Sequence, residues 1–387
     1  MRTIGLLIAY KNPNYGTMLQ AFATQYVIDK LGFNTEIIDY YPNRFNKHYK
    51  WDLGLLPFLW NAYISKKKRK KRIQNSDILF QENLSKRKAS YEDFIKSKLH
   101  DICKIYGYSN LKAKGEKFDA VLIGSDQKWT PGFSFGVDSS FRFVPQHVRT
   151  ISYATSLGVS EYPGYCKNSA KEVWKRIDYL SVRECTGAKI IKSICGENTP
   201  VQVVVDPTYL ITKEEWNKIF PRKRLYENKY IFCYFLGNDI ESKQCARRYA
   251  DANDFKLVSV ISNESYSDID QQYADFLVIG DGPENFVNWI RGAECVFTDS
   301  FHGTAFSIIN EKQIYIFYRK NDSVKLQRHS RIDNILDLFD IKERLITDKR
   351  RDWNTYIEKP INFDDVNVKI AVERKKSLSF LKESLTF

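Results

Sequence analysis

The sequence TIGLLIA at residues 3–9 leads through NPNYG at residues 12–16 into a helical pattern, and TEIIDY follows at residues 35–40. Within the helical pattern Met18, Phe22 and Tyr26 recur every four residues, which gives one apolar stripe suited to packing on a sheet. Gly32 then ends the pattern. A strand, a helix and a second strand in this order form a βαβ unit, so the stretch predicts a parallel sheet.

Further apolar strand patterns continue along the chain in two series, with helical patterns between them. The first series continues at residues 118–123, 150–154, 179–182 and 201–205, and the second lies at residues 230–236, 256–261, 276–279, 295–298 and 314–318. Alternation of strands and helices is typical of open parallel sheets. We therefore predict an α/β fold with two Rossmann-like parallel-sheet domains.

These domains are expected to differ in length. We predict an N-terminal α/β domain over residues 1–220, a C-terminal α/β domain over residues 221–345, and a charged C-terminal helical segment over residues 346–387. Regular alternation breaks down at about residues 43–115, and we interpret this region as an insertion carried by the first domain.

The predicted insertion contains an aromatic, apolar patch at residues 51–64 and seven consecutive basic residues at 66–72. This combination is typical of a protein that binds an anionic membrane face peripherally. The alternative, a solvated basic helix beside a small apolar core, stays open. Nucleic acid is not expected, because the aromatic residues precede the charges and do not interleave with them.

The composition narrows the class of protein. Among 387 residues, 43% are apolar and 28% charged, which is ordinary globular usage and excludes a disordered or fibrous chain. Sixty Lys and Arg against 47 Asp and Glu give a net charge of +13, which favours an anionic partner. The seven cysteines lack the spacing of a zinc site or a disulfide framework, so neither is expected.

The amino terminus opens directly into a strand pattern and shows no signal-peptide pattern. No apolar run approaches the roughly 20 residues of a membrane-spanning helix. We expect a cytoplasmic protein, and peripheral binding at the inner face of the membrane stays open.

Polar residues directly follow four of the predicted strands. Because ligands of open parallel sheets bind beyond the carboxyl ends of the strands, these residues are the candidates for a site. The richest place is the last, where His302 can transfer a proton near neutral pH and the following helix amino terminus suits a phosphate or carboxylate. The four places are Gly124-Ser125-Asp126-Gln127, Arg183-Glu184, Asp206-Pro207-Thr208 and Thr298-Asp299-Ser300-Phe301-His302-Gly303-Thr304.

Each candidate also has a purely structural alternative, which the sequence leaves open. Ser300 is equally suited to capping a helix, and His302 to a hydrogen-bonded position at a strand end. Asp126 and Asp206 are common turn residues. Arg183 could instead form a salt bridge with a neighbouring acidic residue.

Together these residues resemble the polysaccharide pyruvyl transferase family. The resemblance spans roughly residues 5–340, and Lys128 and Thr130 depart from the family's pattern in a way that bears on acceptor preference. Seven motifs occur in the family's order: Asn14-Tyr15-Gly16 with Leu19-Gln20-Ala21, Gly124-Ser125-Asp126-Gln127-x-Trp129, Ile151-Ser152-Tyr153-Ala154, Ser181-Val182-Arg183-Glu184, Asp206-Pro207-Thr208, Thr298-Asp299-Ser300-Phe301-His302-Gly303 and Ser330-Arg331-Ile332.

The resemblance implies a fold like that of two-domain, GT-B-type glycosyltransferases, with the site in the cleft between the domains. It also implies transfer of a pyruvyl group from phosphoenolpyruvate to two hydroxyls of a sugar in a surface polysaccharide or its precursor, forming a cyclic ketal and releasing phosphate. The partners would be phosphoenolpyruvate as co-substrate and a sugar acceptor, free or lipid-linked. No metal or further cofactor is expected.

This reaction needs cations for two anionic groups, a proton donor and a base. We expect His302 and Asp126 to be catalytic, without ranking acid against base. Donor binding is expected from Arg183, Arg331, Ser300, Gly303 and Thr304, and acceptor binding from Gln127, Asn14, Tyr15, Gly16 and Asp206.

Two other functions stay open. A GT-B-type glycosyltransferase with a nucleotide-sugar donor would have the same fold, so fold cannot discriminate between the two enzymes. A non-catalytic basic binding module would depend on residues 66–72 and would not need Asp126, Arg183 and His302 in one cleft.

Overall fold

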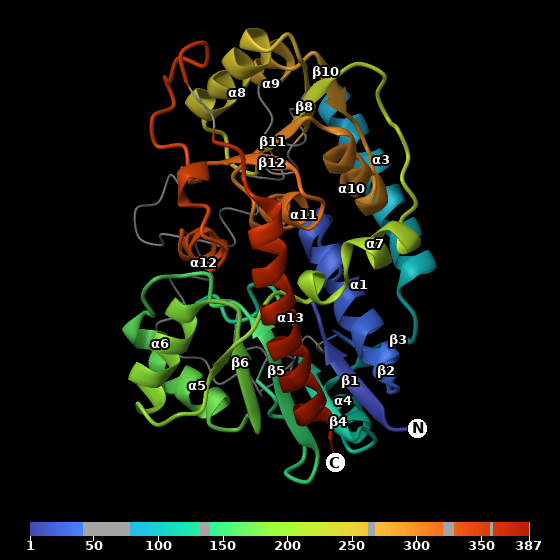
Figure 1. The fold of residues 1–387 in the computed structure, drawn as a ribbon. Helices are drawn as coiled ribbons and strands as arrows, with labels where there is room; N and C mark the ends of the chain where they lie inside the picture. Colours follow the sequence, from blue (N-terminus) through green and yellow to red (C-terminus); the bar gives the residue numbers. More distant parts are fainter. Residues whose placement is uncertain (42–77, 132–139, 262–267, 320–328, 357–358, 387) are drawn as a thin grey trace.

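The structure is a computed structural model that describes residues 1–41, 78–131, 140–261, 268–319, 329–356 and 359–386 (Figure 1). Two α/β domains lie end to end, and a long C-terminal helix runs along both of them (Figure 1). The apolar patch at 51–64 and the basic run at 66–72 lie outside the described residues.

The first domain is built on a seven-stranded sheet in the order β3-β2-β1-β4-β5-β6-β7, in which all the pairings are parallel. Strands such as β4 are buried along their whole length because helices cover both faces of a parallel sheet. The strands are β1 (Thr3–Leu7), β2 (Asn34–Tyr41), β3 (Ile102–Tyr106), β4 (Ala120–Ile123), β5 (Arg149–Thr155), β6 (Tyr179–Val182) and β7 (Gln202–Val203). The helices are α1 (Tyr15–Lys30), α3 (Ile78–Lys98), α4 (Tyr108–Gly115), α5 (Gly164–Trp174) and α6 (Cys185–Cys195).

The second domain is built on a five-stranded parallel sheet in the order β10-β9-β8-β11-β12. Its strands are β8 (Tyr230–Tyr234), β9 (Lys256–Val260), β10 (Phe276–Val278), β11 (Cys295–Thr298) and β12 (Gln313–Ile316). Its helices are α8 (Ile240–Ala252), α9 (Asp268–Tyr273), α10 (Pro283–Gly292), α11 (Phe301–Ile309) and α12 (Ser330–Phe339). The two sheets confirm the predicted fold class, two parallel-sheet α/β domains.

Between the two sheets lie the short helix η2 (Pro207–Leu210) and α7 (Lys213–Ile219). Helix α7 begins with a reciprocal cap, in which Thr212 and Glu215 each accept the other's backbone N–H. The predicted boundary between residues 220 and 221 falls in the connection from α7 to β8.

Residues 78–115 differ from the expectation of an irregular insertion. They form α3, β3 and α4, and β3 pairs in parallel with β2 as the edge strand of the first sheet. The sequence signal is weak there because β3 is short and only Ile105 in it is fully buried, while α3 is rich in charged residues. Helix α3 also contacts the second domain, since Asn83 Oδ1 accepts from Gly280 N at 2.9 Å.

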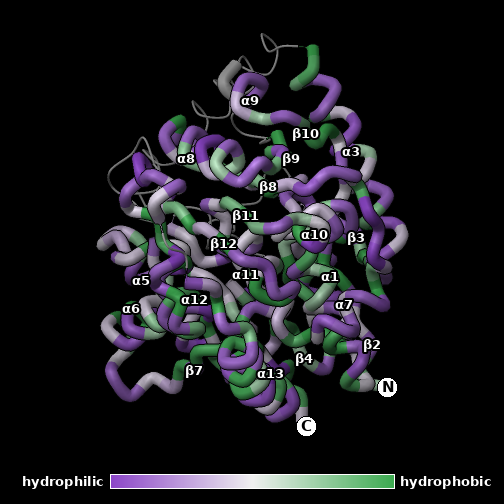
Figure 2. The backbone as a smooth tube through the Cα atoms, turned by 45° about the horizontal axis from the view of Figure 1, so that its top comes forward, coloured by the Kyte–Doolittle hydropathy of each residue, from purple (hydrophilic) through white to green (hydrophobic). Residues whose placement is uncertain are grey.

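A continuous apolar core joins the two domains. One cluster contains Leu122 and Ile151 of the first sheet, Phe22 of α1, and Phe232 and Val258 of the second sheet. Figure 2 shows apolar segments gathered where α1, α10 and α11 meet between the sheets. Because a large apolar interface resists separation, the structure holds the two domains in one relative position.

Helix α13 (Phe363–Leu385) follows the second domain and packs back on the first (Figure 1). The Ser377 hydroxyl accepts from Val205 N at 3.0 Å, and Phe380 contacts the rings of Tyr153 and Tyr179. The prediction of a helical segment over 346–387 is wrong for residues 346–356, which form no helix and place Ile346 and Trp353 in an apolar cluster of the second domain. Helix α13 itself is a strap that ties the end of the chain to the first sheet. Among the described residues, every helix is too short or too polar to cross a membrane.

Truncating the buried face of this strap is expected to destabilise the protein. Phe380 is 5% exposed, so Phe380→Ala should lower the free energy of unfolding by about 3 kcal/mol through lost packing and the cavity left behind. Val372 on the same helix is 60% exposed, and Val372→Ala should change it by less than about 0.5 kcal/mol. Urea unfolding followed by tryptophan fluorescence measures both; equal losses would contradict the strap.

Candidate active site

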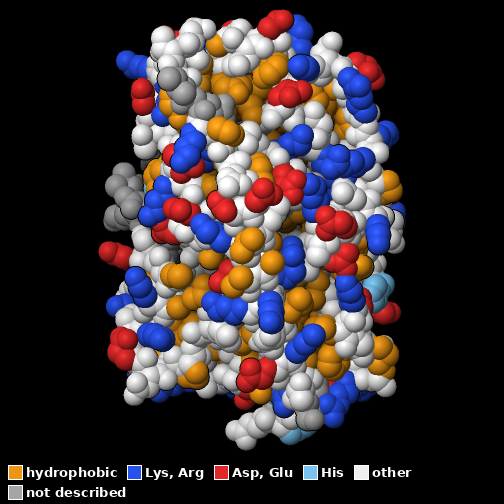
Figure 3. Space-filling model, viewed as in Figure 1, with side chains coloured by type: hydrophobic (Ala, Val, Ile, Leu, Met, Phe, Trp, Pro, Cys, Tyr) orange, Lys and Arg blue, Asp and Glu red, His pale blue; other side chains and the backbone are white. Residues whose placement is uncertain are grey.

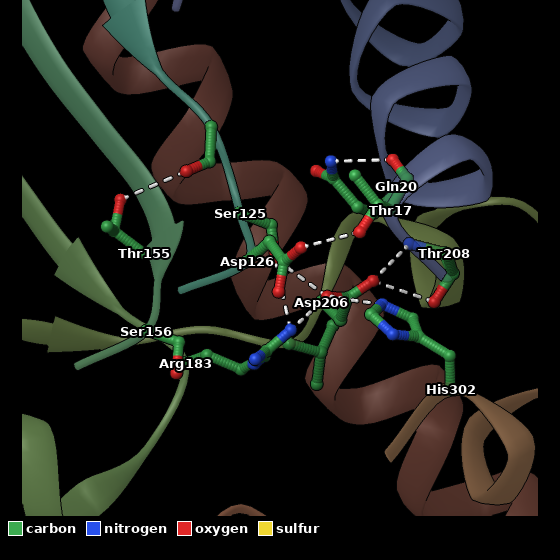
Figure 4. Close-up of polar contacts among 12 residues, drawn as sticks. Thr17, Gln20, Ser125, Asp126, Thr155, Ser156, Arg183, Asp206, Thr208 and His302 are labelled. Atoms are coloured by element: carbon green, nitrogen blue, oxygen red, sulfur yellow. Dashed lines mark hydrogen bonds and ion pairs between the residues drawn. The ribbon is translucent and has the colours of Figure 1, made fainter. Parts of the chain in front are cut away.

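The topological switch points of the two sheets face each other. Strand order reverses direction between β1 and β4 in the first sheet and between β8 and β11 in the second. Ligands of such sheets bind at the carboxyl ends of the strands beside this point. The loops and helices that follow β4, β6, β7 and β11 bring Asp126, Arg183, Asp206 and His302 together there (Figure 4).

The centre of this cluster is a buried ion pair. Arg183 Nη1 donates to Asp206 Oδ2 at 2.7 Å, and the two residues are only 2% and 1% exposed. Ser125 Oγ donates to the same carboxylate oxygen at 2.7 Å, while Thr208 donates to Oδ1 through its N–H and its hydroxyl. Burial alone would raise the pKa of the Asp206 carboxyl, but the contacts with His302, Arg183 and Ser125 outweigh burial and lower this pKa.

Arg183 is held on every side. Its Nε donates to Glu184 Oε1 at 3.2 Å, and its guanidinium lies 4.1 Å from the centre of the Phe301 ring. Burial alone would lower the pKa of the Arg183 guanidinium, but the carboxylates of Glu184 and Asp206 outweigh burial and raise this pKa. Its Nη2 has no hydrogen-bond partner among the described residues, so one donor remains for a ligand.

His302 comes from the second domain and completes the cluster. It is the second residue of α11, is 6% exposed, and places Nε2 at 3.6 Å from Asp206 Oδ2. Within the part of the chain that the structure describes, this nitrogen has no hydrogen-bond partner. The other edge of the ring lies against α1, because a Cβ added to Gly16 would lie 2.0 Å from His302 Nδ1. Gly16 therefore leaves the space that the imidazole occupies.

Asp126 has a strained backbone, with φ of 77°. Such a conformation costs about 1–3 kcal/mol in a non-glycine residue and is often found at functional sites. Thr17 Oγ1 donates to Asp126 Oδ2 at 2.9 Å. Burial alone would raise the pKa of the Asp126 carboxyl, but the charges of His302 and Arg183, among others, lower this pKa. The carboxyl is therefore ionised at neutral pH.

Two more arginines approach the cluster from the second domain. The hydrogen-bond partner of Arg331 is an amide and not a carboxylate. When the side-chain oxygen of Gln127 is turned toward Arg331, it accepts from Nη1 at 3.1 Å and from Nη2 at 2.8 Å. Burial and the guanidinium groups of Arg183 and Arg319 lower the pKa of Arg331. Arg319 lies 3.6 Å from Asp299, which is already bound by the N–H groups of residues 236 and 237. An anion beside Arg331 would relieve this repulsion.

The remaining predicted residues are engaged in local structure. Ser300 caps α11 by accepting from Gly303 N at 3.3 Å, and Thr304 Oγ1 donates to Ser300 O at 3.0 Å. Asn14 caps α1 by accepting from Thr17 N at 3.3 Å. Tyr15 is buried against Phe286, and its hydroxyl donates to Asp281 O at 3.0 Å. Their roles in donor and acceptor binding stay predictions.

Sequence reasoning missed Arg319 and Thr17 as members of the site, and it named Asp299 only as part of a candidate segment without a role. Arg319 carries the signal that singled out Arg183, since it is the first charged residue beyond an apolar strand. Thr17 gives no signal, because a threonine in the first turn of a helix is ordinary. Nowhere in the described ranges do three or more His, Cys, Asp or Glu side chains form a group that could hold a metal ion.

The fold and the cluster define a two-domain α/β protein with a polar site between facing parallel sheets. The model of the family described as polysaccharide pyruvyl transferase matches residues 14–321, and the chain belongs to this family. No curated protein matches the chain.

The chain is also similar to solved structures at low identity. A Staphylococcus aureus MnaA structure with UDP is 12% identical, with a TM-score of 0.49, and the match covers 99% of this chain and 91% of that one. For MurG of Acinetobacter baumannii the identity is 8%, the TM-score 0.46, and the coverage 97% and 95%. For UDP-GlcNAc 2-epimerase of Methanocaldococcus jannaschii in complex with UDP-GlcNAc and UDP they are 11%, 0.49, and 96% and 99%.

The buried pair predicts a specific dependence of stability on pH. The lowered pKa of Asp206 stabilises the fold fully above about pH 4, its unfolded value, and this contribution is lost as pH falls below that toward the lower folded value. Asp206→Asn should therefore cost about 3 kcal/mol at pH 7, and the gap from wild type should narrow below pH 4. Urea titrations from pH 7 to pH 3 measure this, with exposed Asp340→Asn as control. A constant gap would contradict the assignment.

Proposed function

We propose that the protein transfers a pyruvyl group from phosphoenolpyruvate to two hydroxyls of a sugar in a polysaccharide or its precursor, forming a cyclic ketal. Membership of the polysaccharide pyruvyl transferase family supports this reaction class. The observation that carries the proposal is the buried His302 Nε2, which has no hydrogen-bond partner in the described chain and lies beside Asp206, Arg183 and Asp126 at the junction of both sheets.

Phosphoenolpyruvate carries a phosphate and a carboxylate, so its binding site needs cations that are not already neutralised. Arg331 suits this task because its partner is the neutral Gln127 amide. Arg183 has only Nη2 left for a ligand, since Asp206 and Glu184 occupy its other donors. We assign Arg331, with Arg183 Nη2 and Arg319 beside it, to the donor.

His302 gives its proton to the methylene carbon of the donor, which becomes the methyl group, and the central carbon becomes an oxocarbenium ion. One sugar hydroxyl attacks this carbon and gives its proton to the imidazole of His302, which restores the proton that His302 gave. The second hydroxyl then displaces phosphate, which leaves with the remaining proton. The oxygens of Asp206 are already bound by Arg183, Ser125 and Thr208, so this carboxylate is held in place and does not act as the base. Its role is to orient the imidazole of His302.

Asp126 is better suited to orienting the acceptor than to general-base catalysis. A base works best when its pKa lies near the working pH, and the pKa of Asp126 is lowered. As an ionised carboxylate it accepts a hydrogen bond from a sugar hydroxyl and holds it for attack. The proposal needs no further cofactor. The basic sequence at residues 66–72 is the only support for including a lipid-linked acceptor and an anionic membrane surface in the proposal.

Purified protein is to be incubated with phosphoenolpyruvate and a panel of methyl glycosides. We expect release of inorganic phosphate and a mass gain of one pyruvyl group on a glycoside. His302→Ala should cut turnover about 10²-fold or more, because the proton donor is removed. His147→Ala, at an exposed surface histidine, should leave it unchanged.

The competing functions give different results in the same assay. Transfer of a sugar from UDP-sugars without pyruvyl transfer would support a glycosyltransferase instead. Full activity of His302→Ala would remove His302 from the chemistry. No reaction with either donor, together with anionic ligand binding that is lost when the basic run 66–72 is neutralised, would support a non-catalytic binding module.

Gly16 offers an independent test of the position of His302. In Gly16→Ala the added methyl group would lie 2.0 Å from His302 Nδ1, so the imidazole must move and turnover should fall at least about tenfold. Gly164 also lies in the first turn of a helix, but nothing lies within 4 Å of its added methyl group. Gly164→Ala should therefore keep wild-type turnover. Equal activities of the two variants would show that the imidazole position is not critical.

A further inference from the structure

A cavity of about 450 Å³ lies between α6 of the first domain and α12 of the second. Figure 1 shows these two helices facing each other across the junction of the domains. The volume is within the roughly 300–1,000 Å³ of small-molecule sites. Its walls include Cys185, Thr186, Lys189, His329, Asp333 and Asp337.

This cavity adjoins the cluster described above through the backbone of Arg183. Asn334, which also lines it, accepts from Cys185 N through Oδ1 at 3.1 Å and donates from Nδ2 to Arg183 O at 3.4 Å. On the other wall, Ser330 directly precedes Arg331 on α12. A molecule in the cavity would therefore lie next to whatever Arg183 and Arg331 bind.

The lining favours an uncharged, hydroxyl-rich ligand. Among the described residues, Asp333, Asp337 and Lys189 are the charged side chains that line the cavity, and Lys342 pairs with Asp337. This lining shows no excess of cations that would hold a nucleoside diphosphate. Leu338 is its only aliphatic wall among the described residues, which is too little for a lipid tail. The ring of His329 stacks on Tyr318 at 4.0 Å and 7°, which gives the cavity one flat wall beside carboxylate, amide and hydroxyl groups.

We propose that this cavity is the subsite for the uncharged acceptor sugar, with Asp333, Asp337 and Asn334 bonding to its hydroxyls. The inference rests on the proposed pyruvyl transfer and adds where the acceptor lies and what chemistry it has. It separates the two substrates by charge, since the anionic donor lies at the arginines and the neutral acceptor between α6 and α12.

Cys185 reports directly on occupancy of the cavity. It is the only exposed cysteine, since the other six are buried or half-buried. The rate at which N-ethylmaleimide modifies Cys185 is to be measured by mass spectrometry with each methyl glycoside, with phosphoenolpyruvate, and with UDP. We expect at least one glycoside to slow the reaction about fivefold or more and UDP not to slow it, and Cys185→Ser provides the blank.

Kinetics of Asp337→Asn test the same assignment without a label. Its KM for the glycoside should rise about tenfold while the KM for phosphoenolpyruvate stays unchanged, because a charge-assisted hydrogen bond to the acceptor is weakened. Asp340→Asn, three residues further on and outside the cavity, should match wild type in both constants.

The outcomes separate this inference from the proposed function. A glycoside that accepts the pyruvyl group but leaves the maleimide reaction unchanged would overturn the subsite and keep the function. Protection by UDP and by no glycoside would overturn the subsite as well. Protection by a glycoside without any phosphate release would support a sugar site and contradict the pyruvyl transfer.

Discussion

The ion pair between Arg183 and Asp206 determines how the site is assembled. Both residues are almost fully buried, and removing two charges from water costs several kcal/mol per ion before their attraction is counted. Such a pair adds little net stability compared with apolar residues of similar size. Its value lies in position: it joins the ends of β6 and β7, binds Ser125 after β4, and presents a fixed carboxylate to His302.

This arrangement requires the two domains to keep one relative position, since His302 belongs to the second domain and Asp206 to the first. Tyr15 of α1 stacks on Phe286 of α10 with ring centres 4.4 Å apart, and its hydroxyl bonds to Asp281 O. The apolar cluster continues through both sheets. The chemistry is therefore preorganised by hydrophobic packing, so less binding energy is needed to bring its parts together.

The sequence predicted both parallel sheets and the residues at their carboxyl ends, because apolar periodicity reports burial and the end of a strand shows where a side chain reaches the site. It could not predict which residues meet across the domains. The space that Gly16 leaves for His302 depends on how α1 packs against α11. The hydrogen bond from Cys185 N to Asn334 depends in the same way on how α12 packs against α6. Strand β3 was missed because an edge strand with little burial gives almost no periodic signal.

Net charge alone says little about how such a site distinguishes its substrates. On the face shown in Figure 3, basic and acidic side chains of the described residues are interspersed and form no single basic patch. Selectivity follows instead from local pairing. Among the described residues, Arg183 pairs with two carboxylates while Arg331 hydrogen-bonds only to the Gln127 amide, so under the proposed function an anion gains most at Arg331. Between α6 and α12 the described lining has no excess of cations, since Lys342 pairs with Asp337 and only Lys189 lines the cavity, so under the proposed assignment an anion gains less there than at Arg331.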